Sequence, residues 1–179
     1  MLYMVEMDMP HAERLPAWHD WYAHHLERLV AIPGILTAQR FGAGAPTPSP
    51  YLAVYTIANA EVMTSPAYRA KAGPSSTGDW QPLMTNWFRN IVEGVDALPE
   101  IPQRGWLALA DRVDDSAPPL PEGFTALRSV GLDRSFTERG LMIGSEARTP
   151  PAPREEAGWR LRVFTPLSPQ VKARGGGPT

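Results

Sequence analysis

The chain has 179 residues, of which 43% are hydrophobic, so it is long enough for one well-buried domain or for two small halves that share a sheet. Its 17 lysine and arginine residues and 19 aspartate and glutamate residues give a formal net charge of −2 without a long run of one sign, so we expect neither nucleic acid nor a membrane as a partner. The absence of cysteine excludes disulfides, thiolate nucleophiles and cysteine-bound metals.

The first residues of the chain read as a strand and not as a targeting segment. Residues 1–8 lack the basic start of a signal peptide, and no apolar run reaches the roughly 18 residues of a membrane span. We therefore expect a cytoplasmic protein. Alternation over residues 2–7 predicts a strand that places Leu2, Met4 and Glu6 on one face.

An amphipathic helix is predicted next, and it ends at Pro33-Gly34 because proline cannot continue a helix and glycine accepts the backbone angles of its end. His19 and His25 lie on the two edges of its apolar stripe, and His24 lies nearly opposite. The stripe itself follows three- and four-residue steps and consists of Leu15, Trp18, Tyr22, Leu26 and Leu29.

Two strands are predicted to follow, over residues 35–41 and 51–57, with a glycine- and proline-rich turn at residues 42–50 between them. Alternation in the first strand places Leu36, Ala38 and Arg40 on one face. In the second strand it separates Leu52, Val54 and Thr56 from Tyr51, Ala53 and Tyr55.

This helix and the strands around it carry a family resemblance. The run from His19 to Leu29, followed by Ile32-Pro33-Gly34 and Ala38-Gln39-Arg40, resembles the signature of EthD-like proteins of the dimeric α/β-barrel superfamily. In that signature a Trp-Tyr pair precedes a Glu-His, and a Pro-Gly precedes an arginine-bearing strand. The likeness extends through residues 51–55 and 64–68 and covers about the first half of the chain.

The chain departs from this signature at two positions. His24 stands where the family usually has glutamate, and Glu27 stands where it often has proline. If the glutamate serves the family's chemistry, this chain has either lost that chemistry or performs it with an imidazole.

Two more helices are predicted in the first half. Residues 60–72 form a shorter helix interrupted at Pro66, and residues 80–92 form a helix that carries Trp80 and Trp87. The order β-α-β-β-α that precedes the last helix is that of a ferredoxin-like half.

The second half contains a weak repeat of the first. Residues 124–128 resemble residues 36–40, residues 161–165 resemble residues 52–56, and a first-strand candidate at residues 106–112 precedes both. Residues 113–121 are too few and too rich in proline for a long helix, and residues 141–146 are a candidate added strand.

These observations predict an α+β fold, a ferredoxin-like dimeric α/β barrel with two unequal βαββ-type halves. The first half, with the long helix and the candidate site, covers residues 1–98, a degenerate second half covers residues 105–168, and residues 169–179 form a disordered tail. The strands close one barrel within the chain or pair with a second copy, since either arrangement removes exposed edges. We expect a homodimer.

Three residues are predicted to carry chemistry. The resemblance marks His25 as a general base. Burial and a neighbouring carboxylate would tune the pKa of His25 toward neutrality. Tyr55 would donate a hydrogen bond to a developing oxyanion. Arg40, which is costly to bury unpaired, would hold an anionic ligand group or pair with a carboxylate from Glu6 or Asp8, of which Glu6 is the expected partner. Residues predicted to contact the substrate are Glu6, Trp18, Tyr22, Tyr51, Trp80 and Trp87.

The spacing of His19, His24 and His25 does not predict a metal site, because neighbouring positions on a helix diverge. The usual local motifs of dinucleotide enzymes, nucleotide hydrolases, serine hydrolases and zinc proteases are missing. The resemblance implies a protein that handles apolar or aromatic small molecules without a cofactor, and we predict a lyase, isomerase or cyclase that transfers protons. Two alternatives stay open, a non-catalytic small-molecule-binding or accessory barrel and a haem-binding barrel.

Overall fold

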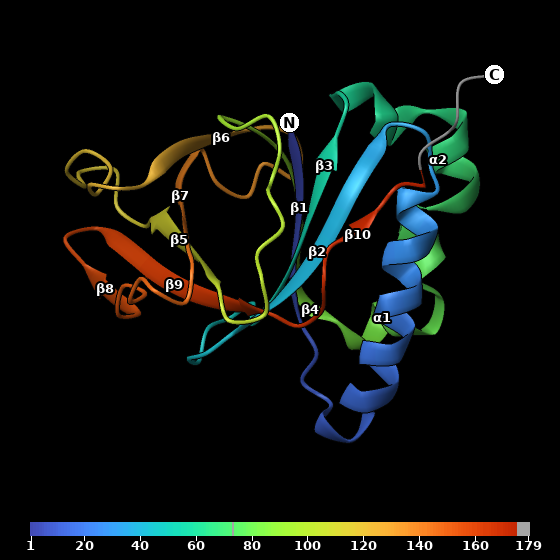
Figure 1. Cartoon of the computed structure of the whole chain (residues 1–179), viewed down its shortest axis with the longest axis horizontal. Helices are drawn as coiled ribbons and strands as arrows, with labels where there is room; N and C mark the ends of the chain where they lie inside the picture. The colour runs from blue at the N-terminus through green and yellow to red at the C-terminus, as the bar shows by residue number, and fades with distance from the viewer. Residues whose placement is uncertain (73, 175–179) are drawn as a thin grey trace.

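The computed structural model describes residues 1–72 and 74–174. In this part of the chain, strands dominate and the helices lie in the first half (Figure 1). The helical segments are η1 (Ala12–Arg14), α1 (Leu15–Val30), η2 (Ala60–Thr64), α2 (Pro66–Lys71) and η3 (Pro74–Leu83). The strands are β1 (Leu2–Asp8), β2 (Ile35–Ala43), β3 (Tyr51–Ile57), β4 (Thr85–Glu93), β5 (Trp106–Arg112), β6 (Thr125–Leu132), β7 (Glu138–Gly144), β8 (Arg154–Glu156), β9 (Trp159–Pro166) and β10 (Val171–Lys172).

Eight of the strands in the described residues close an antiparallel barrel within the single chain. The strand order is β2-β3-β1-β4-β6-β7-β5-β9, and β9 pairs with β2 through Phe41 opposite Pro166 and Ala43 opposite Phe164. The barrel therefore needs no second copy to cover its strand edges.

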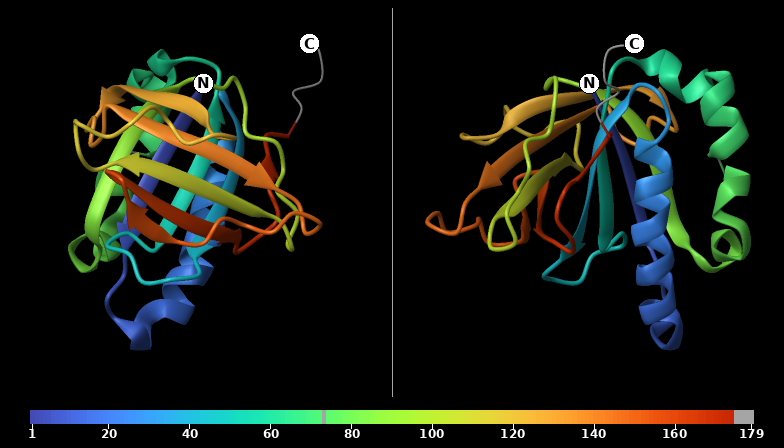
Figure 2. Two further views of the ribbon diagram at one scale, coloured as in Figure 1. Left: turned by 90° about the vertical axis from the view of Figure 1, so that its left-hand side faces the viewer. Right: turned by 45° about the vertical axis from the view of Figure 1, so that its right-hand side comes forward.

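The two sets of four strands are arranged in the same way. When the four barrel strands of each set are numbered along the chain, leaving out β8, both sets have the spatial order second, third, first, fourth. The first set is β2-β3-β1-β4, and the second is β6-β7-β5-β9. The fourth strand of each set pairs with the second strand of the other. Helices α1 and α2 cover the first set, as Figure 2 shows, whereas turns and loops connect the second set.

Strand alternation divides the apolar residues into two main cores. Inside the barrel, Leu2 and Met4 of β1 pack with Leu52 and Val54 of β3. Outside the barrel, the opposite faces of β1 and β3 pack against α1, whose buried residues are Trp18, Tyr22, His25, Leu26, Leu29 and Val30. The predicted faces of these two strands are confirmed.

The end of α1 is set by the Pro33-Gly34 turn. Gly34 has a φ of +90°, and a Cβ at this position would overlap the side chain of Val62. Glycine is therefore required both by the backbone angle and by the close approach of η2.

The predicted helix over residues 80–92 is wrong. Residues 85–93 form β4, in which Trp87 and Ile91 face the helix layer while Val92 faces the barrel interior. Pro82 lies at the end of η3, and the aromatic and β-branched residues after it favour a strand. Tryptophans spaced seven residues apart were misread as one helical face.

Two further differences lie in the second half. The candidate added strand at residues 141–146 belongs to β7, a barrel strand between β5 and β6. Residues 171–172, in the predicted disordered tail, form β10 and pair with Ala38 and Thr37 of β2. Residues 175–179 lie outside the described residues.

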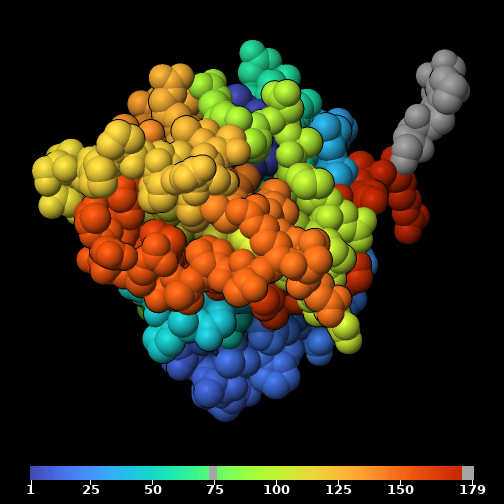
Figure 3. Space-filling view, turned by 60° about the vertical axis from the view of Figure 1, so that its left-hand side comes forward, coloured from blue at the N-terminus to red at the C-terminus, as the bar shows by residue number. Residues whose placement is uncertain are grey.

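The face opposite α1 is built from the second set of strands and the turn at residues 44–50, which lies beside β9 in Figure 3. The backbone N–H of Gly44 donates to the carbonyl of Val163 at this contact. In the part of the chain that is described, no helix is long and apolar enough to cross a membrane.

Candidate functional site

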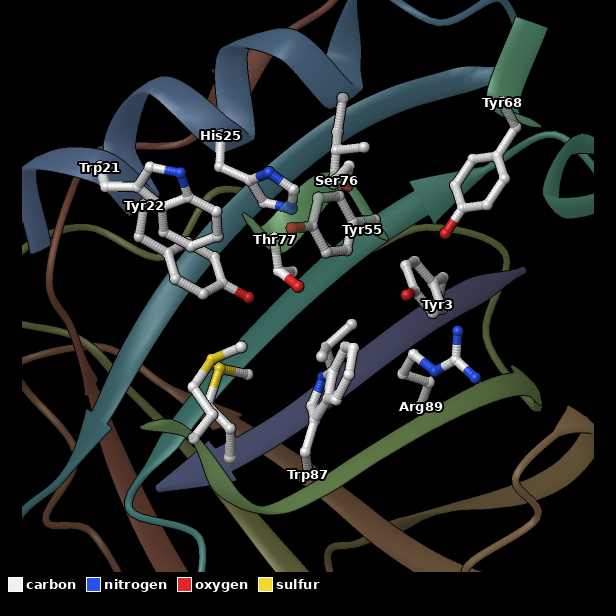
Figure 4. Close-up of a pocket in the computed structure, with 14 residues that line it drawn as sticks. Tyr3, Trp21, Tyr22, His25, Tyr55, Tyr68, Ser76, Thr77, Trp87 and Arg89 are labelled. Carbon is white, nitrogen blue, oxygen red and sulfur yellow. The ribbon is translucent and has the colours of Figure 1, made fainter. Parts of the chain in front are cut away.

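A pocket lies between α1 and the outer faces of β1, β3 and β4, and η3 closes its remaining side. Figure 4 shows its side chains pointing toward a common centre. The free volume is ≈ 30 Å³, which is room for about one water molecule. We call it the α1 pocket, and its lining consists of Tyr3, Val5, Met7, Trp21, Tyr22, His25, Leu29, Tyr55, Tyr68, Ser76, Thr77, Met84, Trp87 and Arg89.

His25 is held in the wall of this pocket by two neighbours on its own helix. Its ring stacks on Trp21 with centroids 4.7 Å apart, and Arg28 Nη2 donates to His25 Nδ1 over 2.9 Å. Arginine always carries its protons, so Nδ1 is the acceptor and the neutral ring has its proton on Nε2. His25 therefore offers the pocket a hydrogen-bond donor.

The pKa of His25 is lowered from 6.5 to about 4 by burial, with the positive charges of Arg28 and Arg40 adding to the effect. The predicted neighbouring carboxylate is not present among the described lining residues. His25 is thus neutral near pH 7, and it is a much weaker base than the sequence predicts.

Four phenols surround the centre of the pocket: Tyr3, Tyr22, Tyr55 and Tyr68 (Figure 4). The Tyr55 hydroxyl is fully buried and makes no hydrogen bond of good geometry, although the hydroxyl of Tyr22 lies close enough to interact with it. Burial raises the pKa of Tyr55 well above its usual value, and the phenols of Tyr22 and Tyr3 raise it further. Tyr55 is therefore a neutral hydroxyl whose one nearby acceptor, the Tyr22 hydroxyl, is poorly aligned, and a ligand oxygen in the pocket would accept from it better.

The electrostatic surroundings of the pocket are positive. Arg89 lines it, while Arg28 and Arg40 act on His25 from outside the lining. Asp133 balances part of the Arg89 charge from 3.4 Å. Because no carboxylate lines the described pocket, a ligand that carries negative charge is favoured there.

The structure brings together four of the predicted site residues and separates the others. His25, Tyr55, Tyr22 and Trp87 line the α1 pocket. Trp80 contacts Trp21 at a centroid distance of 6.1 Å but does not line the pocket.

Arg40, Trp18 and Tyr51 form a neighbouring cluster on the other side of Tyr22. The Arg40 guanidinium lies 4.2 Å from the ring centroid of Trp18 and 4.1 Å from that of Tyr22. Its Nη1 donates to His19 Nδ1 over 2.8 Å. Arg40 therefore does not line the α1 pocket, and it influences the pocket only through its positive charge.

The predicted pairing of Arg40 with Glu6 is wrong, because the two side chains lie on opposite faces of the sheet. Glu6 points into the barrel, where its carboxylate contacts Arg139 Nη2 at 2.8 Å and Arg162 Nη2 at 2.6 Å. Asp111 completes this buried network by pairing with the Nε atoms of the same two arginines. Glu6 lines a separate cavity of ≈ 230 Å³ at one end of the barrel.

His24 lies away from both sites. Its side chain is exposed, and its Nδ1–H donates to the backbone carbonyl of Asp20 over 2.8 Å. An imidazole at this position therefore does not reach the α1 pocket. Within the described residues, no three His, Asp or Glu side chains are grouped as metal ligands.

Comparisons with known proteins give one informative result. No family model matches the chain, and no curated protein matches it in sequence, so the EthD-like resemblance is not confirmed. The chain is similar in fold to a protein described as anthrone oxidase-like. The two share 12% identity at a TM-score of 0.55, over 96% of this chain and 93% of the solved one. At this identity the likeness shows the fold, that of a small barrel protein.

The prediction missed several lining residues of the α1 pocket. The sequence prediction gives Tyr3 no role, although its alternation with Val5 and Met7 on the first strand places all three under the helix. Ser76 and Thr77 come from the first part of η3, a stretch between the two helices predicted at residues 60–72 and 80–92 for which the sequence indicates only a loop. Tyr68 lies at residues 64–68, where the chain resembles the EthD-like signature, and this resemblance is the one feature of the sequence that points to Tyr68.

Proposed function

We propose that the protein is a cofactor-free enzyme that binds a flat aromatic ketone or phenol in the α1 pocket and stabilises the anion formed when this molecule loses a proton. The observation that supports the proposal is the set of groups at the pocket, which combines buried donors and nearby guanidinium groups with no carboxylate in the described lining. Such surroundings stabilise negative charge as it develops.

In this proposal His25 Nε2–H and the Tyr55 hydroxyl donate to the oxygen of the bound molecule. Charge accumulates on that oxygen when a proton leaves a carbon that is conjugated with it through the aromatic rings, and the fixed donors lower the free energy of the anion. A solvent molecule accepts the proton. His25 thus acts as a donor, because Arg28 occupies the nitrogen that a general base would use.

Anthrone is the probe that the structural neighbour suggests. Loss of a proton from its methylene carbon gives an electron-rich anion that O₂ oxidises. One anthrone and one O₂ then give one anthraquinone and one water. The walls of Trp21, Tyr22 and Trp87 suit a flat ring system. Anthrone is larger than the free volume, so Trp87 or η3 must shift when it binds.

The experiment measures O₂ uptake and quinone formation with anthrone at pH 7. We expect turnover by the native chain and a loss of about 10- to 1,000-fold in kcat for His25→Gln and Tyr55→Phe, because each removes one donor to the oxyanion. Matched controls are His24→Gln, an exposed neighbour, and Tyr51→Phe, a phenol outside the pocket. Both controls should retain activity.

Binding of anthrone without turnover would instead support a non-catalytic small-molecule-binding barrel. Equal activity in all four variants would remove the α1 pocket from the mechanism.

We also infer that the two four-strand sets are the halves of a duplicated ferredoxin-like barrel. Their identical strand order and reciprocal pairing support this inference. The homodimer and the cytoplasmic location stay predictions, because a barrel closed within one chain neither requires nor forbids a second copy.

A further inference from the structure

A second cleft lies along the edge of α1 that faces β10, away from His25. Its volume is ≈ 200 Å³, which exceeds the α1 pocket severalfold. The connector between β9 and β10 forms one wall, and α1 forms the other. We call it the Arg40 cleft, and its lining consists of His19, Ala23, Leu26, Arg40, Leu167 and Ser168.

Arg40 is an unbalanced charge at the bottom of this cleft. The residue is 4% exposed, and no carboxylate of the described residues lies within 4.0 Å of its guanidinium. Its Nε and Nη2 atoms are buried without a hydrogen-bond partner. Burial lowers the pKa of Arg40 to about 10, yet the group stays cationic at neutral pH. The aromatic rings around it offset part of this cost, but an anion would offset more.

Ser168 supplies a second unused polar group from a distant part of the sequence. Its Oγ is buried without a hydrogen-bond partner. The backbone carbonyl of the same residue accepts from Gln39 Nε2 over 3.2 Å, which fixes the connector against β2 beside Arg40. Two buried polar side chains without full pairing at one cleft are unusual in a folded protein.

The third polar group, His19, is also a donor. Its Nδ1 accepts from Arg40 Nη1, so the neutral ring carries its proton on Nε2. Burial lowers the pKa of His19, and the charge of Arg40 lowers it further. Every polar side chain of the described lining can therefore donate to a ligand, and none is negatively charged.

The remaining walls are apolar, from Ala23, Leu26 and Leu167, and the Leu167 side chain is 43% exposed. A ligand that fits has one anionic end and a short apolar body. One guanidinium matches one carboxylate, and a planar carboxylate accepts from arginine in a fork geometry.

We propose that the Arg40 cleft is a second binding site, which takes a small organic carboxylate: the carboxylate meets Arg40, Ser168 and His19, and the apolar body lies against Ala23, Leu26 and Leu167. The site is separate from the α1 pocket, and it does not depend on the chemistry proposed there.

Calorimetric titration of the full chain with benzoate tests the proposal, with benzamide as the uncharged probe of the same shape. We expect benzoate to bind and benzamide to bind at least about tenfold more weakly, since hydrogen bonds to a charged group are the stronger ones. Arg40→Met should weaken benzoate binding about 10- to 100-fold. Ser168→Ala should weaken it by a smaller factor.

Two further variants keep the test valid if Arg40→Met does not fold. Ala23→Phe fills the cleft from an exposed helix position without touching the polar groups, and it should abolish benzoate binding. His25→Gln alters the α1 pocket alone and should leave benzoate binding unchanged, even where anthrone turnover is lost. Benzoate binding that survives Ala23→Phe, or that is equal for benzamide, would overturn the proposal, as would no binding of benzoate at millimolar concentration.

Discussion

His25 shows how one contact decides the chemistry of a residue. A histidine beside an apolar stripe is consistent with a base, a ligand contact or a structural hydrogen bond. Arg28, one helical turn further along, donates to Nδ1 and turns the Nε2–H side of the ring toward the pocket. Burial and two arginines then hold the pKa of His25 at about 4.

This lowered pKa predicts a loss of stability in mild acid. The unfolded chain protonates His25 near pH 6.5, while the folded chain resists protonation down to about 4. Between these values the unfolded state binds more protons, so stability falls as the pH drops. The full loss is about 3 kcal/mol, at about 1.4 kcal/mol per pKa unit.

Urea unfolding at pH 7 and at pH 4 measures this loss. His25→Gln should have a smaller decrease than the native chain, and His24→Gln should have the same decrease as the native chain. An equal decrease in His25→Gln would show that the ring is not buried in its neutral form.

At the scale of elements, the turn after α1 is the most sharply specified position. Gly34 combines a φ of +90° with direct contact to Val62 of η2. Gly34→Ala should therefore lower the free energy of unfolding by about 1–3 kcal/mol. Gly44→Ala, at an open position of the β2–β3 turn, is the control. Thermal unfolding that is unchanged in Gly34→Ala would contradict this account of the turn.

Local sequence patterns predicted the elements around α1 well and β4 poorly. Helix α1 has a clear stripe and a clear stop signal, and β2 and β3 are bounded by residues that favour turns and are rich in β-branched and aromatic residues. In residues 85–93 both faces of the strand are partly apolar, because one packs under the helices and the other lines the barrel. A strand with two apolar faces has no period of two, and its tryptophans imitate a helix.

Long-range contacts explain why the candidate site was predicted only in part. Alternation correctly placed Tyr51 and Tyr55 on one face of their strand, and the pairing of Arg40 with Ala53 brings Arg40 to the same face of the sheet. It could not show that Glu6 faces the barrel interior and meets Arg139 and Arg162, which lie far along the chain. The sequence repeat also aligned the wrong strands of the two sets. Residues 161–165, which resemble part of β3, belong to β9, whereas the strand that corresponds to β3 by position is β7.

At the scale of the whole molecule, the buried charge network joins the two sets of strands. Glu6 comes from β1, and Asp111, Arg139 and Arg162 come from β5, β7 and β9. Burial raises the pKa of Asp111, but Arg139 and Arg162 lower it by more, so this carboxylate stays charged in the folded chain. Two negative and two positive side chains balance one another in charge, although Arg139 Nη1 is buried without a hydrogen bond. Replacing any one of the four with a neutral residue would leave a buried charge unbalanced.

Glu6→Gln should therefore destabilise the chain by about 3–5 kcal/mol, because two buried guanidinium groups lose half of their balancing charge. Glu100→Gln is the matched control, since its pair with Lys172 is exposed and contributes less than about 1 kcal/mol. Urea unfolding followed by circular dichroism compares the two. Similar, small effects would show that the network does not hold the barrel together.

The most direct test of the central claim is a crystal structure of the protein grown with anthraquinone, the product of the proposed reaction. The account predicts the quinone between α1 and the barrel, beside Trp21, with a carbonyl oxygen within hydrogen-bond distance of His25 Nε2 and the Tyr55 hydroxyl, and with Trp87 or η3 displaced. A quinone bound in the cavity beside Glu6 would contradict the account. So would an α1 pocket that holds no quinone and keeps its side-chain arrangement at saturating quinone.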